Sequence, residues 1–299
     1  MNSSSIMFLF FVLFSPLVSI LLNDWIFSWG MMEVSMICLF PLLLSDSSKE
    51  SMLKYFLIQS LASMFMLISG VLYFNLYEQE YIFYILFLMS LSLKIGFFPG
   101  HFWVPSVMSS VGMISMMLLL GPMKFIPLAF FNLSFQILDK ILFTVLILAV
   151  FSTIVGAILG NNQTSIRSML GSSSISHSGW MMVAMCYNWL WMYFFSYLLI
   201  LMFFCVSFFY QQYFSMMINI VSLSGIPPFL VFILKMKVLM FLSSSMEYLM
   251  FVVLILSSIF SLVFYLKFFY SFLLMSKNYN YFSILVFSLL NVLGIFVLF

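Results

Sequence analysis

The sequence contains very little charge. Only 6% of its 299 residues are Asp, Glu, Lys or Arg, whereas 65% are hydrophobic, and the mean hydropathy is +1.24. A water-soluble protein of this size needs far more polar surface than these residues provide. Uncharged apolar runs of 17 or more residues recur along the chain, and such a run can cross the hydrocarbon core of a bilayer. The sequence therefore predicts a membrane protein.

Cysteine clusters, Gly-rich loops and basic stripes are also absent from the sequence. Its three cysteines, Cys38, Cys186 and Cys205, lie in separate apolar runs without metal-ligand spacing, which excludes the usual iron–sulfur motifs. We expect them to be small packing residues. No dinucleotide-binding fingerprint is present, and the net charge of +2 is too scattered for nucleic-acid binding. We therefore expect this chain to bind no cofactor, metal or nucleic acid.

Apolar runs and breaks divide the sequence into eleven candidate membrane helices. Most are long enough, at about 1.5 Å per residue, to cross a hydrocarbon core of about 30 Å. We therefore predict an all-α, polytopic fold that forms a single integral membrane domain over residues 1–299. The first run lacks the basic leader of a signal peptide and is expected to be retained. The predicted spans are 6–22, 25–44, 52–74, 81–105, 107–131, 137–159, 166–187, 189–210, 213–242, 247–273 and 282–299.

Two of these spans contain residues that interrupt helices. The ninth span is too long for one straight crossing and contains Gly225 followed by Pro227 and Pro228. The fourth span contains the pair Pro99-Gly100. Because proline removes a backbone donor and glycine loosens a helix, we expect both spans to be discontinuous.

The charges in the loops predict an orientation. If residues 1–5 lie on side A, basic residues gather on or near side A and acidic residues gather on side B. The positive-inside rule then makes side A the cytoplasm or the mitochondrial matrix, with the C-terminus on the opposite side. Side A collects Lys49, Lys54, Arg167 and Lys277, and side B collects Asp24, Glu78, Glu80, Asp139, Lys140 and Glu247.

Four ionisable residues lie inside the apolar runs: Glu33, Lys94, Lys124 and Lys235. A charge at the centre of a membrane helix costs roughly 2.5–3.5 kcal/mol, so four unpaired charges would cost about 10–14 kcal/mol. Such residues usually face one another or a watery cavity, and they mark ion paths and proton relays. All three lysines lie near a glycine or proline that disturbs a helix, as in the discontinuous helices of transporters.

The four buried ionisable residues suggest a proton relay, but two of them also have simpler structural interpretations. Glu33 either pairs with a basic residue of another helix or stays protonated and hydrogen-bonded to a neighbour. Lys94 either carries a proton or extends its stem toward the membrane surface as a structural lysine. Pairing and unpairing with Glu33 would switch Lys94 between holding and releasing a proton. Lys124 would accept that proton through water, and Lys235 would pass it on.

Three further residues are secondary candidates. His101 and His177, the latter within a Ser-rich segment at 172–178, could supply intermediate stations of a relay. For each histidine taken alone, a structural hydrogen bond is the better expectation. Lys237 lies two residues after Lys235 and points to a different helix face, and we favour Lys235 because of its position after Pro228.

Ordered motifs extend over nearly the whole chain. They include Lys94-Ile-Gly-Phe-Phe-Pro99-Gly-His101-Phe-Trp103-Val-Pro105, Ser173-Ser-Ile-Ser-His177-Ser-Gly179-Trp180-Met-Met, and the segments 23–36, 54–59, 162–167 and 223–229. Together they resemble the subunit 2 family of mitochondrial NADH:ubiquinone oxidoreductase, respiratory complex I. Two positions depart from the pattern of that family, since Ser106 replaces an acidic residue and Ser168 replaces a basic one.

The resemblance implies an antiporter-like membrane-arm subunit with two related five-helix units, one broken helix in each, and without the first three helices of full-length relatives. It implies that Glu33 pairs with Lys94, that Lys124 is the central relay lysine, and that Lys235 belongs to the second broken helix. As a subunit of this enzyme the chain would take part in proton translocation, while FMN, iron–sulfur clusters and ubiquinone would belong to other subunits.

The resemblance also implies a location and partners. The chain would lie in the mitochondrial inner membrane, with its N-terminus in the matrix and its C-terminus in the intermembrane space. It would contact other membrane-arm subunits, accessory subunits and lipids. Two alternative functions remain: a stand-alone or multisubunit cation/proton antiporter component, and a structural scaffold. A sodium path would favour additional buried carboxylates, and Glu33 is the only acid in the middle of a predicted span.

Overall fold

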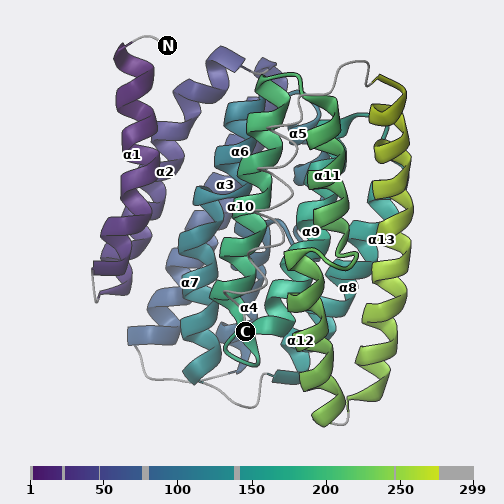
Figure 1. The fold of residues 1–299 in the computed structure, drawn as a ribbon. Helices are drawn as coiled ribbons and strands as arrows, with labels where there is room; N and C mark the ends of the chain where they lie inside the picture. Colours follow the sequence, from purple (N-terminus) through teal and green to yellow (C-terminus); the bar gives the residue numbers. More distant parts are fainter. Residues whose placement is uncertain are drawn as a thin grey trace. The chain divides into compact units, whose positions relative to one another are not determined.

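Helices make up all the regular structure that the computed structural model describes, in residues 3–21, 24–46, 48–75, 81–137, 142–245 and 247–275 (Figure 1). Six helices are long and apolar enough to cross a membrane, and further apolar helices are shorter. The prediction of an all-α, polytopic membrane protein is therefore confirmed. The predicted span 282–299 and the loop charges at 78, 80, 139, 140 and 277 lie outside the described residues, so the count of eleven spans stays a prediction.

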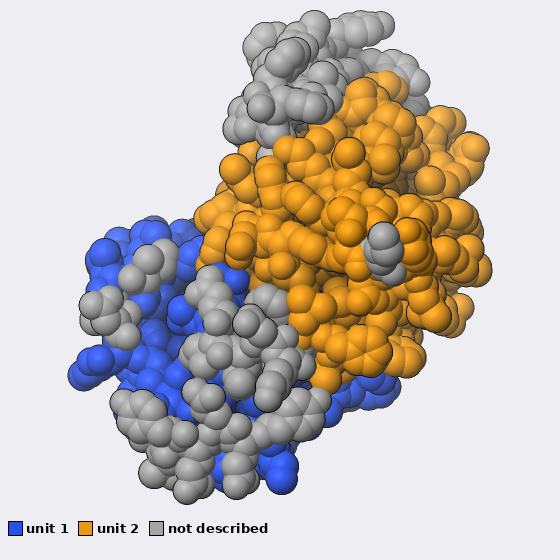
Figure 2. Space-filling model, turned by 90° about the horizontal axis from the view of Figure 1, so that it is seen from below, with its two compact units in different colours: residues 1–141 blue, residues 142–299 orange. Residues whose placement is uncertain are grey.

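The chain divides into two compact units, residues 1–141 and 142–299, which are coloured separately in Figure 2. In unit 1, α1 packs along α2, α3 packs along α4, and α7 contacts α1, α2 and α4. The helices of unit 1 are α1 (Ser3–Leu21), α2 (Trp25–Asp46), α3 (Lys49–Gly70), the π-helix η1 (Val71–Asn75), α4 (Tyr81–Ile95), α5 (Trp103–Met108), α6 (Met113–Leu120) and α7 (Pro122–Ile137).

A break separates α4 from α5. Gly96 follows the end of α4 with a φ angle of 82°, a left-handed conformation that glycine adopts without steric cost. The chain then turns through Pro99 until α5 begins at Trp103. The predicted boundary between the fourth and fifth spans, at 105–107, falls inside α5 and was wrong. Pro105 occupies the first turn of that short helix, where a missing backbone donor is tolerated.

Unit 2 is built around α9, in which every residue from Ser168 to Met185 is buried. The helices α8 and α9 pack closely, and α13 contacts both α8 and α11. The helices of unit 2 are α8 (Leu142–Asn161), α9 (Ile166–Met185), α10 (Leu190–Phe209), α11 (Tyr213–Ser224), α12 (Leu230–Ser244) and α13 (Tyr248–Met275).

A second break separates α11 from α12. Gly225 has a φ angle of 78° directly after α11, and Pro227 and Pro228 follow it before α12 begins at Leu230. Glycine permits the left-handed turn, and the prolines supply no backbone donors to continue α11. The sequence features that suggested discontinuous helices therefore coincide with helix ends in both units.

Close packing of α8 against α9 depends on Gly156. A Cβ atom at Gly156 would lie 2.5 Å from the backbone nitrogen of Ser176, whereas a Cβ atom at Gly30 would meet nothing within 4 Å. We expect Gly156→Val to destabilise the protein by about 1–3 kcal/mol or more, because the two helices must separate. The measurement is the amount of protease-resistant chain in membranes. Gly30→Val is the matched control, and equal amounts of the two variants would contradict the expected packing.

Candidate functional site

An ion pair joins two helices inside unit 1. The Nζ atom of Lys94, on α4, lies 2.7 Å from the Oε1 atom of Glu33, on α2. The side chain of Lys94 is 3% exposed and that of Glu33 is 18% exposed. Glu33 therefore has a basic partner on another helix, and Lys94 does not extend its stem to the surface. Breaking such a buried pair from one side leaves an uncompensated charge.

The break after α4 leaves backbone carbonyl groups beside Lys94 that neighbouring side chains satisfy. The last carbonyls of a helix have no partner within the helix. The indole Nε1 of Trp103 donates to the Leu93 carbonyl at 2.9 Å, and the amide Nε2 of Gln59 donates to the Lys94 carbonyl at 3.3 Å. The backbone that carries Lys94 is thereby held by α5 and α3.

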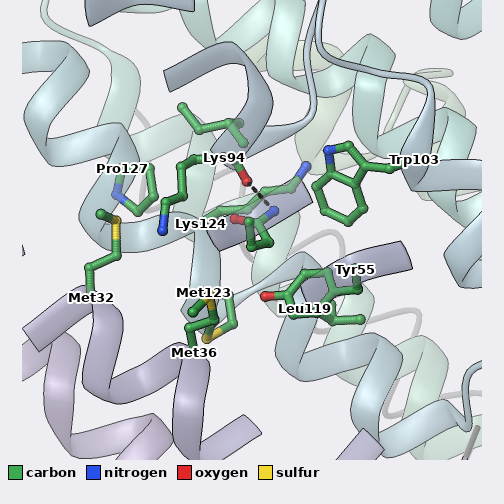
Figure 3. Close-up of a pocket in the computed structure, with 11 residues that line it drawn as sticks. Met32, Met36, Tyr55, Lys94, Trp103, Leu119, Met123, Lys124 and Pro127 are labelled. Atoms are coloured by element: carbon green, nitrogen blue, oxygen red, sulfur yellow. Dashed lines mark hydrogen bonds between the residues drawn. The ribbon is translucent and has the colours of Figure 1, made fainter. Parts of the chain in front are cut away.

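Lys124 lies near Lys94 across a small cavity (Figure 3). It belongs to the first turn of α7, which begins with Pro122 directly after Gly121, and it is 4% exposed. No hydrogen bond or ion pair joins its Nζ atom to any other residue that the structure describes. The lining residues are Met32, Met36, Tyr55, Gln59, Lys94, Ile95, Trp103, Leu119, Met123, Lys124 and Pro127.

The cavity has room for a water molecule. It offers about 20 Å³ to the centres of water molecules, and one buried water needs roughly 10–15 Å³ and two to four polar partners. Lys94, Lys124, Gln59 and Tyr55 bring polar groups to its wall. The arrangement can therefore support a water-mediated hydrogen bond between two lysines in an otherwise apolar environment.

His101 lies in the break between α4 and α5 but does not line this cavity. Its Nδ1 atom lies 3.1 Å from the Pro99 carbonyl. Its ring packs against the rings of Phe98 and Phe102, with centroids 5.9 and 4.1 Å away. These contacts give His101 a structural position within the break and do not place it between the lysines.

Lys235 is placed at the break in unit 2. Its Nζ atom donates to the Ser224 carbonyl at 2.9 Å, at the open end of α11. The same atom lies 5.5 Å from the centre of the Trp180 ring, within the range of a cation–π interaction. Lys235 is 6% exposed, whereas Lys237 is half-buried, with its Nζ atom 4.2 Å from the Trp189 ring. Lys235 is therefore the lysine that lies at the break.

His177 lies in a tyrosine cage in unit 2. Its Nδ1 atom lies 3.0 Å from the Tyr193 hydroxyl and its Nε2 atom lies 3.2 Å from the Tyr265 hydroxyl. The Tyr197 ring packs 4.9 Å from the histidine ring. The serines of segment 172–178 donate their hydroxyl groups to carbonyls three residues earlier in α9. These hydroxyl hydrogens are engaged by the helix backbone.

Three residues of the unit 1 site had no predicted role. Tyr55 and Gln59 lie four residues apart on α3, so they face the same side of that helix, and both line the cavity. Trp103 lines the cavity from α5. The sequence contained a signal, because Gln59 is an amide within an apolar run and all three residues belong to the motifs that carry the family resemblance. Motif membership alone did not show what they contact.

The sequence and the fold are similar to those of known respiratory proteins. Residues 21–261 match the family described as NADH:quinone oxidoreductase/Mrp antiporter, transmembrane. NADH-ubiquinone oxidoreductase chain 2 of Albinaria caerulea is 33% identical over 288 residues, covering 94% of this chain and 94% of the relative. The protein of that name from Anopheles gambiae is 34% identical over 306 residues, covering 93% of this chain and 88% of the relative.

A solved structure shares the fold. A chain in respiratory complex I from Thermus thermophilus with bound aureothin matches with a TM-score of 0.72 and 19% identity. The match covers 90% of this chain and 73% of that chain. It supports the same antiporter-like arrangement of helices.

The ion pair gives a stability prediction. Glu33→Gln is expected to destabilise the protein by about 3–5 kcal/mol, because the buried Lys94 ammonium loses its charged partner. The double variant Glu33→Gln with Lys94→Gln should recover much of this loss. The measurement is the heat resistance of the membrane-extracted assembly.

A matched control removes a different carboxylate. Glu50→Gln breaks the pair between Glu50 and Lys54, which lie 2.6 Å apart with side chains 78% and 52% exposed. Solvent screens such a pair, so no measurable change is expected. Equal effects of Glu33→Gln and Glu50→Gln would contradict a stabilising role for the buried pair.

Proposed function

The chain belongs to the NADH:quinone oxidoreductase/Mrp antiporter transmembrane family, in the branch of NADH-ubiquinone oxidoreductase chain 2, and on that premise we propose that it translocates protons within respiratory complex I. The proposed path is a relay of Glu33, Lys94, Lys124 and Lys235. Oxidation of NADH and reduction of ubiquinone take place in other subunits, which hold FMN and the iron–sulfur clusters. The chain converts an electrostatic or conformational signal from those subunits into proton movement.

One observation carries this proposal. Two buried lysines line one cavity, and among the residues that the structure describes only Lys94 has a carboxylate partner. Desolvation disfavours a buried ammonium, whereas a carboxylate within about 4–6 Å favours it. The paired Lys94 is therefore the side chain that holds a proton, and the unpaired Lys124 is the one that is ready to receive it. This difference gives the relay a direction in unit 1.

The first step is separation of the ion pair. When Glu33 moves away from Lys94, or is itself neutralised, the Lys94 ammonium loses the charge that stabilises it in an apolar environment. Its proton passes to a water molecule in the cavity, and that water gives a proton to the Lys124 amine. Lys124 then passes its proton on toward Lys235, and re-forming the pair with Glu33 favours uptake of a new proton by Lys94 from the entry side of the path. Each cycle thus transfers one proton across the cavity.

Lys235 also binds and releases a proton in unit 2, but different groups stabilise its ammonium. Its ammonium is stabilised by the Ser224 carbonyl and by the face of the Trp180 ring, and no carboxylate of the described residues pairs with it. Carbonyl oxygens and aromatic faces favour a cation less strongly than a full negative charge does. Lys235 can therefore accept a proton and release it without first breaking an ion pair.

The energies are compatible with proton transfer against a membrane potential. Moving one charge across 100 mV requires about 2.3 kcal/mol. Breaking a buried ion pair from one side costs about 3–5 kcal/mol. Making and breaking the Glu33–Lys94 pair therefore involves a free energy of the same size as the work of transport. The pair is a suitable element for coupling an outside signal to proton release.

The location and partners follow from the same premise. The chain lies in the mitochondrial inner membrane as a multi-pass subunit among other membrane-arm subunits, accessory subunits and lipids. Its N-terminus faces the matrix, and its C-terminus faces the intermembrane space. His101 and His177 are auxiliary stations at most, because their observed contacts are to a backbone carbonyl and to tyrosine hydroxyls.

Replacing the central lysine tests the relay. Lys124→Met keeps the length of the side chain and removes a charge that has no ionic partner among the described residues, so assembly should be preserved. Proton uptake per electron should fall. The measurement is quinone reduction and proton uptake in sealed inner-membrane vesicles, together with the amount of assembled complex.

Lys54→Met, on the exposed start of α3, is the control. Full proton uptake per electron in the Lys124→Met variant would exclude the relay, and loss of assembly alone would favour a scaffold.

Two neighbouring lysines test the relay in unit 2. Lys235→Met should lower proton uptake per electron, because it removes the cation that lies at the break after α11. Lys237→Met should leave this ratio unchanged, because Lys237 is half-buried against Trp189. Both variants make the same chemical change on the same helix. A larger effect of Lys237→Met would assign the terminal position to that residue instead.

A further inference from the structure

Gln59 connects α3 to the backbone of the broken helix. Its side chain is 3% exposed, and its Nε2 atom donates to the Lys94 carbonyl at 3.3 Å, the hydrogen bond drawn as a dashed line in Figure 3. In an uninterrupted helix the Lys94 carbonyl would accept from the backbone four residues later. Because α4 ends at Ile95, Gln59 takes the place of that missing donor.

The chemistry of the contact fixes how the amide is oriented. A carbonyl oxygen only accepts hydrogen bonds, so the part of Gln59 that faces it must be the NH₂ group. The amide is planar, and its oxygen therefore points away from the Lys94 carbonyl. No other hydrogen bond of the Gln59 side chain exists with residues in the described ranges. The oxygen retains its capacity to accept a hydrogen bond.

The same side chain lines the cavity that both lysines reach. Gln59, Lys94 and Lys124 all contribute to its wall, and the cavity accommodates about one water by the volume given above. An ammonium group can only donate to such a water, whose own hydrogens need acceptors because a buried water makes two to four hydrogen bonds. An amide oxygen is a neutral acceptor of this kind. It stabilises a donor without binding a proton permanently.

We propose that Gln59 is a positioning residue of the lysine site, and this inference rests on the proposed function. Its NH₂ group holds the end of α4 at the Lys94 carbonyl, and its amide oxygen orients the water or ammonium between Lys94 and Lys124. One side chain thus fixes both the backbone of the donor lysine and the path to the acceptor lysine.

Trp103 complements this role without duplicating it. Its indole nitrogen holds the preceding carbonyl, that of Leu93, and Trp103 lines both the inner cavity and an apolar hollow that Leu93 and Phe102 also line. Trp103 has no acceptor atom to offer a water. The orienting acceptor therefore comes from Gln59, while Trp103 supports the end of α4 through the Leu93 carbonyl.

The test replaces Gln59 by a side chain of similar size that forms no such hydrogen bonds. Gln59→Met in the assembled respiratory complex is expected to keep quinone reduction within about twofold of normal. Proton uptake per electron should fall by at least half of the fall caused by Lys124→Met. The measurement uses sealed inner-membrane vesicles and records the two rates separately. A residue that only supported the fold would lower both rates with the amount of complex and leave their ratio unchanged.

Gln163→Met is the matched control. The Nε2 atom of Gln163 also donates to a backbone carbonyl, that of Leu159, at 3.2 Å. Gln163 follows the end of α8 and does not line the lysine cavity, and its own backbone carbonyl accepts from the exposed Lys267 at 2.8 Å, a contact that the substitution keeps. The Gln163→Met variant should therefore take up the normal number of protons per electron. If Gln59→Met and Gln163→Met take up equal numbers of protons per electron, the proposed role of Gln59 is wrong.

Two further comparisons keep the test decisive. If Lys124→Met itself pumps normally, the proposed function fails; if only Gln59→Met pumps normally, the role of Gln59 alone fails. If the Gln59→Met variant does not assemble, the same ratio of proton uptake to electron transfer is measured in Gln59→Asn instead. It keeps an amide in the buried position but is one methylene shorter, so it cannot reach both the carbonyl and the cavity. A lowered ratio in Gln59→Asn supports the inference, and a normal ratio overturns it.

Discussion

A charge can remain inside a bilayer only if protein groups replace the water that would solvate it, and the whole architecture of this chain reflects that constraint. Lys94 is solvated by Glu33 from another helix. Lys235 is solvated by a free backbone carbonyl and an aromatic ring. Lys124 has no hydrogen-bond or ionic partner among the described residues for its ammonium, and it lines a cavity large enough for about one water. The three lysines therefore differ in how strongly their surroundings favour the ammonium, and a relay requires such differences.

The helix breaks supply the means of meeting this constraint. In the interior of an intact helix each carbonyl accepts from the backbone four residues later, so it is not available as a main ligand for a buried cation. Ending α11 at Ser224 exposes the carbonyl that binds Lys235. Ending α4 at Ile95 exposes carbonyls that side chains from α3 and α5 must satisfy. In unit 2 a carbonyl at the helix break thus binds a lysine directly. In unit 1 the carbonyls at the break are bound by side chains of neighbouring helices.

Much of this could be predicted from the sequence because charges and prolines are so rare in it. Glu33 and Lys94 stand out within apolar runs, and Gly225 with the following prolines identifies a break. The partner role of Gln59 could not be predicted, because its contact depends on how α3 packs against the end of α4, which is a tertiary property. The wrong boundary at Pro105 has a local reason: proline is tolerated in the first turn of a helix as well as between helices.

The two histidines show why residue type alone does not identify a proton path. Both are buried and both form hydrogen bonds, yet His101 contacts a backbone carbonyl and His177 contacts two tyrosine hydroxyls. Neutral partners of this kind can orient an imidazole without changing its charge. The lysines differ from the histidines because one of them, Lys94, has an ionic partner, Glu33, on another helix. In the proposed relay it is therefore the withdrawal of a charged partner, and not a titratable side chain by itself, that decides where the proton resides.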